Sequence, residues 1–481
     1  MNIKISHIIL VAFCLAVSIL YFLTLAHYPG RAAAYAIFTI SLNALFVIGF
    51  TKGRIFFDTF IGIFFWLGFW LKFSVRVAFM GGNFHEPVGN FNGTGTAFDS
   101  ALLVTSCGVI GLLLASFVRR KFPFSYEKAS SQIQSEKTFS FYQRYRVSAL
   151  VLFFVLFVIV AVTNATFGIY QRGTVSRTIL PFGFGGIYAW LLLFGFASFS
   201  AVILDCEFRL KKNPYLASII ALLECFSSNV SMLSRGMILN SGALMLGAHE
   251  KTKRCFMDPS LLYKLTMCFV LAALFISSIF VTSHVRSYIY SVSGTKVVTH
   301  DTLAHTAKVG QVLMLDRWVG IEGVMAVSSY PGLGWDLWKK AWLERFSRSG
   351  TSMYDLTFIV SPYVEMDKSI NHFVSVPGIL AFFYYPGSYV FLFVSMLFLG
   401  FLGAGIEVFV YKLGGANIIL CSLLAQIVAY RYAHFGYAPN QSYLLFGSIL
   451  LNVLIIYFFN KFLLRINKAE GHGCQSGTYT S

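Results

Sequence analysis

The run LYKLTMCFVLAALFISSIFVT, residues 262–282, contains Lys264 as its one charged residue and ends where a long polar stretch begins. As a helix, such a run is long enough to cross a hydrocarbon layer of about 30 Å. The polar stretch extends from Ser283 to Val376 and holds eight of the 20 Asp and Glu residues of the chain. Apolar runs interrupted by one large polar segment predict a membrane protein with a substantial extramembrane loop.

Similar apolar runs occur on both sides of this one. The chain of 481 residues is 57% hydrophobic and 12% charged, and this charged fraction is about half of the roughly 25% usual in soluble domains. The runs are continuous rather than alternating, which is typical of helices and not of barrel strands. We therefore expect an all-α polytopic membrane protein with about 12 transmembrane helices and a large outward loop. The expected spans are residues 7–25, 32–50, 55–72, 98–118, 147–168, 184–204, 214–232, 236–249, 262–282, 386–411, 413–430 and 441–464.

Basic residues gather in every second connector between these spans, for example at Arg119–Lys121 and Lys251–Arg254. Cytoplasmic connectors of membrane proteins carry such an excess of Lys and Arg. Both termini are therefore expected in the cytoplasm and the polar stretch outside. The same bias accounts for the net charge of +17 without a nucleic-acid partner. Lys72 and Arg76 after the third span, and Arg172 after the fifth, run against it.

Three regions follow from this organisation: N-terminal transmembrane helices in 1–283, an outer, periplasmic loop in 284–376, and C-terminal transmembrane helices in 377–481. In segment 214–249, two crossings have to share few residues, so we expect two short or broken spans that meet between Ser227 and Asn240. Irregular backbone at membrane depth must be buried in protein or line a cavity. A single crossing would reverse the orientation of the loop, and this alternative stays open.

An arginine, Arg235, lies between those two runs in the element Ser234-Arg235-Gly236. A charged side chain at membrane depth is costly unless it meets water, a partner or a ligand, and a guanidinium group suits a pair of phosphate oxygens. The alternative is a side chain that reaches the interface or pairs with Glu224. Arg286, at the start of the polar stretch, is a second candidate for substrate binding.

The polar stretch contains the segment LDRWVGIEG, residues 315–323, with Asp316, Arg317 and Glu322 close together. A carboxylate can take the proton from a sugar hydroxyl, and a neighbouring guanidinium group can stabilise pyrophosphate. We predict that these three residues are catalytic. Ordinary surface ion pairs are the alternative.

The outward connectors also hold basic and aromatic residues. Those expected to bind substrate are Arg172, Arg345, His372 and Arg431. The three tryptophans of segment 335–342 have helical spacing, which favours an amphipathic helix at the membrane interface. The glycine-rich run GFLGAG, residues 400–405, is expected to let two helices pack closely.

Some well-known motifs are absent from the sequence. It has no GxxxxGK[ST] phosphate loop, no HExxH element and no Cys/His cluster with metal-ligand spacing. We therefore expect no metal site and no cofactor.

With about twelve spans, a large late loop, the Ser234-Arg235-Gly236 element and LDRWVGIEG within the loop, the chain resembles the Wzy-type O-antigen polymerases of bacteria. The resemblance implies a glycosyltransferase of lipopolysaccharide and polysaccharide biosynthesis in the bacterial inner membrane. It would join undecaprenyl-pyrophosphate-linked oligosaccharide repeat units at the outer leaflet. A chain-length regulator and a flippase are the protein partners that the resemblance allows.

Three other functions stay open. An O-antigen ligase uses the same donor and has a similar architecture. A flippase or transporter of lipid-linked oligosaccharides also fits about twelve spans, although no internal repeat is visible. A non-catalytic membrane scaffold is the third.

Overall fold

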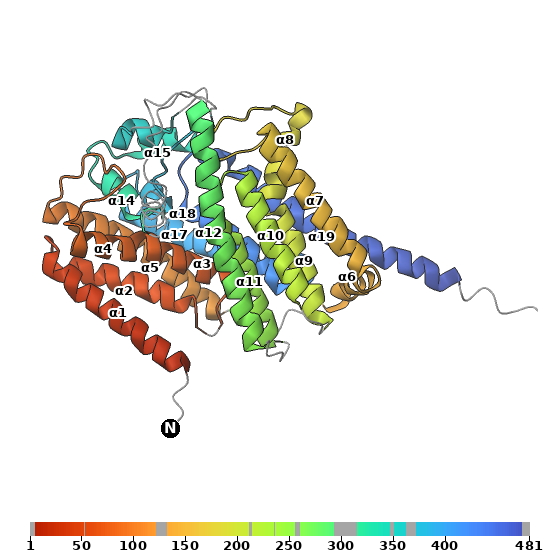
Figure 1. The fold of residues 1–481 in the computed structure, drawn as a ribbon. Coiled ribbons are helices and arrows are strands. Elements are labelled where there is room, and N and C mark those ends of the chain that lie inside the picture. The colour runs from red at the N-terminus through yellow and green to blue at the C-terminus, as the bar shows by residue number, and fades with distance from the viewer. Residues whose placement is uncertain are drawn as a thin grey trace, which may run out of the picture.

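The computed structural model describes residues 5–51, 53–121, 132–210, 214–234, 236–254, 260–292, 315–346, 351–361 and 372–473. Within these ranges, every regular element is helical (Figure 1). The elements are α1 (Ile5–His27), α2 (Ala32–Ile48), α3 (Phe56–Phe65), η1 (Trp66–Leu71), α4 (Lys72–Phe79), α5 (Gly95–Lys121), α6 (Gln132–Arg144), α7 (Arg146–Phe167), η2 (Pro181–Gly183), α8 (Phe184–Trp190), η3 (Leu191–Gly195), α9 (Phe196–Arg209), α10 (Tyr215–Ser231), α11 (Met237–Arg254), α12 (Leu261–Val292), α14 (Ile321–Ser328), α15 (Trp335–Trp342), η4 (Asp355–Ile359), α16 (Ile379–Phe383), α17 (Tyr389–Leu413), α18 (Ile418–Ala433), η6 (Pro439–Gln441) and α19 (Ser442–Gly473).

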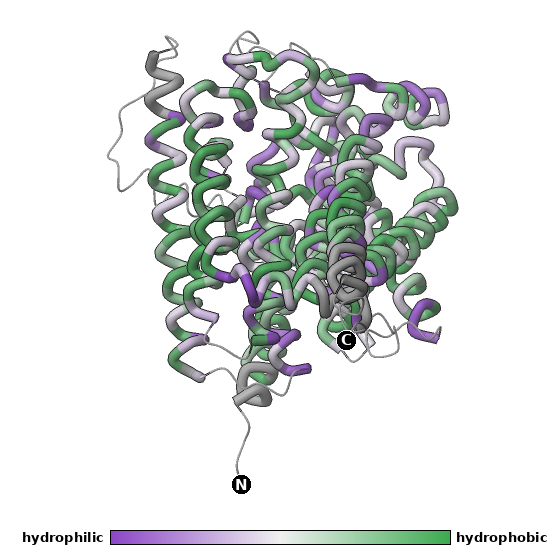
Figure 2. Tube along the Cα trace, turned by 90° about the vertical axis from the view of Figure 1, so that its right-hand side faces the viewer, coloured by the Kyte–Doolittle hydropathy of each residue, from purple (hydrophilic) through white to green (hydrophobic). Residues whose placement is uncertain are grey.

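Several of these helices have the length and composition of membrane spans. Among the described residues, seven segments are long and apolar enough: Phe56–Phe79, Gly95–Lys121, Arg146–Phe167, Pro181–Arg209, Leu262–Arg286, Tyr389–Leu413 and Pro439–Phe462. Shorter apolar helices occur at Val11–His27, Ala32–Ile48, Tyr215–Ser231 and Ile418–Ala433. Figure 2 shows hydrophobic residues along most of the helix lengths. The chain is thus a helical, multi-pass membrane protein, and the count of about twelve crossings stays a prediction.

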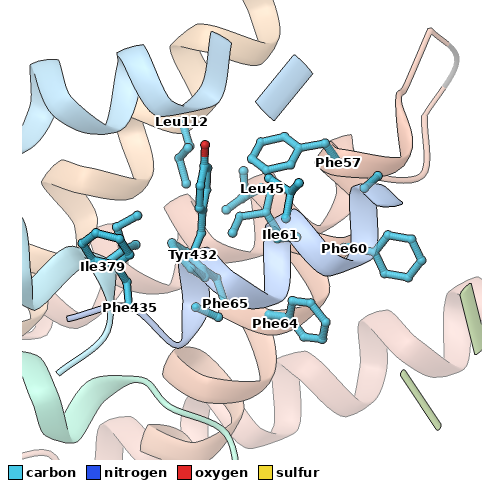
Figure 3. Packing of buried hydrophobic residues seen from close by; sticks show 14 of the residues in the cluster. Leu45, Phe57, Phe60, Ile61, Phe64, Phe65, Leu112, Ile379, Tyr432 and Phe435 are labelled. Atoms are coloured by element: carbon cyan, nitrogen blue, oxygen red, sulfur yellow. The ribbon is translucent and has the colours of Figure 1, made fainter. Parts of the chain in front are cut away.

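Helix α18 lies inside the bundle and packs against α3, α9, α11 and α17. Its buried residues occur on all sides of the helix, as expected for an apolar helix surrounded by protein. It begins at Asn417, whose side chain accepts hydrogen bonds from the backbone N–H groups of Ile419 and Leu420, a standard helix cap. Figure 3 shows its Tyr432 among hydrophobic side chains that include Phe57 of α3.

Helices α1, α7, α12 and α19 expose apolar side chains on their outer faces. Phe22, Val147 and Phe269 are 66%, 71% and 74% exposed. Only 17% of the apolar part of α12 is buried, compared with 67% of the α3–α4 segment. Apolar faces of this extent indicate contact with lipid.

Close packing of α17 depends on the run 400–405. A Cβ atom on Gly400 would lie 2.6 Å from the Cβ of Ala115 in α5, and one on Gly403 would lie 2.5 Å from the ring of Phe57. Both distances are shorter than real Cβ contacts, so a larger residue at either position would have to displace its neighbour. The expectation that this run brings helices together is confirmed.

The segment between Tyr215 and Arg254 forms two helices, as expected. Helix α10 ends at Ser231 and α11 begins at Met237, and Leu233 between them has a left-handed backbone (φ +52°). The side chain of Asn164 donates hydrogen bonds to the Ser231 carbonyl (3.0 Å) and to its hydroxyl (2.8 Å). The non-helical segment between α10 and α11 is therefore bonded to neighbouring protein rather than left exposed to lipid.

The polar stretch is organised by short helices. Helix α12 continues to Val292, so the region assigned to the loop begins inside a helix. The tryptophans of segment 335–342 do form a helix, α15, which lies near the upper end of the molecule in Figure 1. Trp335 is 57% exposed, whereas Trp338 packs on Phe391 of α17 with ring centroids 5.4 Å apart.

Candidate functional site

Two adjoining cavities lie where the loop meets the helix bundle. The first, which we call the helix cavity, has a volume of about 310 Å³. The second, the loop cavity, has a volume of about 290 Å³. Arg172, Tyr430 and His434 line both. The two cavities are therefore adjacent, and these three side chains belong to the walls of both.

The helix cavity is lined by both apolar and polar side chains, and three of the polar residues also line the loop cavity. Its apolar residues come from η3, α10–α11, α18 and α19: Leu193, Phe194, Met232, Leu239, Ile427, Leu444 and Leu445. Its polar residues are Arg172, Asn229, Ser234, Asn240, Gln426, Tyr430, Arg431, His434, Gln441 and Ser442. A ligand with an apolar chain and an anionic head would match this mixed lining.

Arg431 and Arg172 supply the guanidinium groups of the helix cavity. Arg431 donates to the hydroxyl of Ser442 (3.3 Å) and lies over the ring of Phe435 (5.6 Å). Arg172 lies beside the hydroxyl groups of Tyr170 and Tyr430. Neither arginine has an ion pair with a carboxylate among the described residues, so their positive charges are available to an anion.

His434 lies just beyond the end of α18, between the two cavities. Its ring stacks on Tyr430 with centroids 4.0 Å apart. Burial and the positive charges of Arg317, Arg172 and Arg431 lower the pKa of His434 to about 3. At neutral pH the imidazole is therefore uncharged, and Nδ1 lies 3.2 Å from the Tyr430 carbonyl oxygen. In the tautomer that donates there, Nε2 remains an acceptor.

A buried lysine forms the floor of the loop cavity. Lys72 is 1% exposed, and its ammonium group donates to both carboxylate oxygens of Glu322, at 2.9 and 3.1 Å. It also donates to the carbonyls of Asp316 (2.9 Å) and Trp318 (2.6 Å). One turn further along α4, Arg76 pairs with the carboxylate of Asp316. Segment 316–322 is thus attached to α4 by two ion pairs.

The backbone makes the same connection. A Cβ atom on Gly68 in η1 would lie 2.4 Å from the carbonyl oxygen of Val319, and one on Gly320 would lie 1.9 Å from the carbonyl oxygen of Gly68. Glycine is needed at both positions because the two backbone segments touch there. The π-helical turn η1 directly precedes Lys72, and such turns occur often at functional sites.

Glu322 is 4% exposed. Burial raises its pKa above the usual range, and the charge and hydrogen bonds of Lys72 oppose this shift. A buried pair of this kind is costly to break from one side. Glu322 and Asp316 therefore hold the loop in place. Of the three residues predicted to be catalytic, Arg317 is the one whose side chain is exposed, and it lines the loop cavity.

Most of the residues predicted from the sequence do meet here. The loop cavity contains Arg172, Arg286, Asp316, Arg317, Glu322 and His372, and the helix cavity contains Arg172 and Arg431. Arg286 donates to the carbonyls of Arg172 (3.2 Å) and Leu233 (2.5 Å), so it joins α12 to the break after α10. Arg345 is exposed and is not among the described residues that line either cavity. Arg235 lies outside the described residues, although its neighbours Ser234 and Gly236 line the helix cavity.

Lys72, Glu86, Tyr430 and His434 were not predicted as site residues. Lys72 and Arg76 did carry a signal, because they are four residues apart and both oppose the charge bias of the connectors. If the orientation is the one that the charge bias predicts, basic residues at this end of a span need another reason to be there, and their ion pairs with the loop supply one.

Neither a metal site nor a likeness to a known protein identifies the chemistry of these cavities. Within the described ranges, no group of three His, Cys, Asp or Glu side chains could hold a metal ion. Comparisons with protein-family models, with curated proteins and with solved structures found no match for this chain. The function is therefore argued from the geometry of the two cavities.

Proposed function

We propose that the protein is a membrane glycosyltransferase that polymerises lipid-linked oligosaccharide repeat units into a surface polysaccharide such as O-antigen. The donor would be a polyprenyl-pyrophosphate-linked glycan, and the acceptor a sugar hydroxyl of a second lipid-linked unit. The observation that carries this proposal is that the walls of a largely apolar cavity contain two arginines beside an uncharged histidine, His434.

Each part of such a donor has a matching part of the site. The apolar walls of the helix cavity suit the start of the polyprenyl chain. Arg172 and Arg431 suit the pyrophosphate, whose negative charge increases as the glycosidic bond to it breaks. The adjoining loop cavity, with Arg317 and His372, would receive the sugars. No metal or nucleotide is required for this transfer.

The proposed topology places this site on the outer face of a bacterial inner membrane. Taking α1, α2, α3–α4, α5, α7, α8–α9, α10, α11, α12, α17, α18 and α19 each as one crossing gives twelve and puts both termini in the cytoplasm. Cysteine labelling from either side of the membrane would test it. A Cys at position 336 should react with an impermeant reagent only from outside, and one at position 144 only from inside.

The attachment of the loop favours an enzyme over a transporter. Segment 316–322 is bound to α4 by the buried pairs Lys72–Glu322 and Arg76–Asp316. Alternating access needs one bundle to move against another, and these contacts oppose such movement. They suit a fixed active site, which has to hold its groups in place.

Deletion of the gene in its own host separates the remaining candidates. Loss of a polymerase leaves lipid A core capped with a single repeat unit, whereas loss of a ligase leaves no capped core. Loss of a flippase leaves the lipid-linked unit on the cytoplasmic side, where it cannot reach the core. A ladder of normal length in the deletion strain would refute all three and leave the scaffold.

A further inference from the structure

Three carboxylates line the loop cavity, and two of them are already engaged. Glu322 accepts from Lys72 with both oxygens, and Asp316 pairs with Arg76. The third, Glu86, has no hydrogen bond or ion pair with any other residue that the structure describes, yet it lines the same cavity. It is therefore the acidic group of the cavity wall that can still accept a proton or a hydrogen bond from a ligand.

The connector between α4 and α5 holds Glu86 in position from both sides. Glu86 precedes Pro87, which also lines the cavity and restricts the backbone before it to extended conformations. Phe84 stacks on Phe73 of α4, with ring centroids 6.4 Å apart. Gly89 has φ +59°, and a Cβ atom there would lie 2.0 Å from the carbonyl oxygen of Phe358.

The electrostatic surroundings place this carboxylate near the other groups of the cavity. Burial raises the pKa of Tyr354 well above the usual range, and the negative charges of Glu322, Asp355 and Glu86 add to that effect. The charge of Glu86 also contributes to the raised pKa of Glu322. Arg172, which lines both cavities, shares the wall of the loop cavity with Glu86.

We propose that Glu86 is the catalytic base of the transfer, an assignment that rests on the function proposed above. Its carboxylate would take the proton of the acceptor hydroxyl as that oxygen bonds to the anomeric carbon of the donor. The bond from the anomeric carbon to the phosphate oxygen breaks, and its electron pair leaves with the pyrophosphate. Arg172 and Arg431 would meet the added negative charge in the helix cavity.

This arrangement has a stereochemical consequence. A carboxylate that only takes the proton of the acceptor hydroxyl forms no covalent intermediate with the donor sugar. Attack from the side opposite the leaving group is a single displacement, which inverts the anomeric configuration. The new linkage should therefore have the anomeric configuration opposite to that of the sugar–pyrophosphate bond.

The test uses membranes from a strain that lacks the chromosomal gene and carries the full-length protein on a plasmid. The probe is the undecaprenyl-pyrophosphate-linked repeat unit extracted from the same deletion strain. Wild-type membranes should extend it into a ladder. If they do not, the proposed function itself fails, and the assignment of Glu86 falls with it.

With an active wild type, Glu86→Gln should extend the probe at least about 100-fold more slowly, the lower end of what a general base contributes. Binding of the probe should stay within about threefold of wild type, because the arginines are intact. Asp336→Asn, which changes an exposed carboxylate on α15, should match wild type in both measurements.

A smaller variant separates a chemical role from a structural one. In Glu86→Ala, added formate should restore part of the rate, because it can fill the space and accept the proton. Extension by Glu86→Gln within about threefold of wild type would overturn the assignment. So would a Glu86→Ala protein that reaches the membrane but gains nothing from formate, or a product that keeps the donor's anomeric configuration.

Discussion

Replacement of Lys72 by methionine removes the ammonium group from the wall of the loop cavity and keeps an apolar side chain that reaches as far as Cε of the lysine. Glu322, which is 4% exposed, then loses the cation that compensates its charge. We expect segment 316–328 to detach from α4 more often, because an uncompensated buried carboxylate favours the detached state. Two carbonyls, those of Asp316 and Trp318, also lose a donor, at about 0.5–1.5 kcal/mol each.

The electrostatic cost of leaving the Glu322 carboxylate without Lys72 has an upper limit, because Glu322 can take up a proton instead of staying charged. From its ordinary pKa of 4.5, the limit at pH 7 is about 3.4 kcal/mol, at 1.36 kcal/mol for each pH unit. At pH 5 the limit falls to about 0.7 kcal/mol. The sign follows from the raised pKa of Glu322: the attached loop holds the proton more tightly, so attachment strengthens as the pH falls towards 4.5.

Amide hydrogen exchange in α14, measured by mass spectrometry, reports this local opening. The ratio of exchange rates in Lys72→Met and wild type should fall by up to about 100-fold between pH 7 and pH 5. The double variant Lys72→Met/Glu322→Gln should show no such pH dependence, and Lys340→Met on the exposed face of α15 should match wild type. A ratio near one at pH 7, or a raised ratio that does not change with pH, would refute the reasoning.

Two further predictions concern the contacts around the site. Gly68→Ala should lower the melting temperature of the detergent-solubilised protein, because its Cβ would lie 2.4 Å from the Val319 carbonyl oxygen and such overpacking costs about 1–3 kcal/mol. Gly242→Ala in α11 should not lower the melting temperature, because the added Cβ meets nothing within 4 Å. Arg431→Ala should weaken binding of the lipid-linked repeat unit by about 10- to 100-fold, as expected for a lost charge-assisted hydrogen bond. The side chain of Arg31 is 87% exposed, so Arg31→Ala should leave the measured affinity unchanged. Equal affinities of the Arg431 and Arg31 variants would contradict the placement of the pyrophosphate.

The helices were predictable because they depend on local composition. Apolar runs longer than a bilayer needs have few alternatives to a helix, and the shortness of segment 214–249 already required the break that Leu233 makes. The close contact at Gly400 was also foreseeable, since small residues in an apolar run allow helices to approach.

The contacts within the site were not predictable in the same way. Lys72 and Glu322 are 250 residues apart, and no periodicity in either segment indicates that they meet. The pattern LDRWVGIEG suggested free catalytic carboxylates, whereas the buried partners on α4 show that two of its charges hold the loop. Glu86 lies outside the motifs recognised in the sequence, and what distinguishes it is that it has no partner among the residues that the structure describes.

The contact between Gly68 and Gly320 also bears on attempts to exchange the long loop for that of another protein. The long loop leaves the bundle at α12 and returns at α17, so a chimaera would naturally exchange the residues between those two helices. Segment 316–322 of that loop, however, is shaped to fit η1 and α4, which lie far earlier in the chain. A loop transplanted from a related protein should work only when residues 66–76 are transplanted with it.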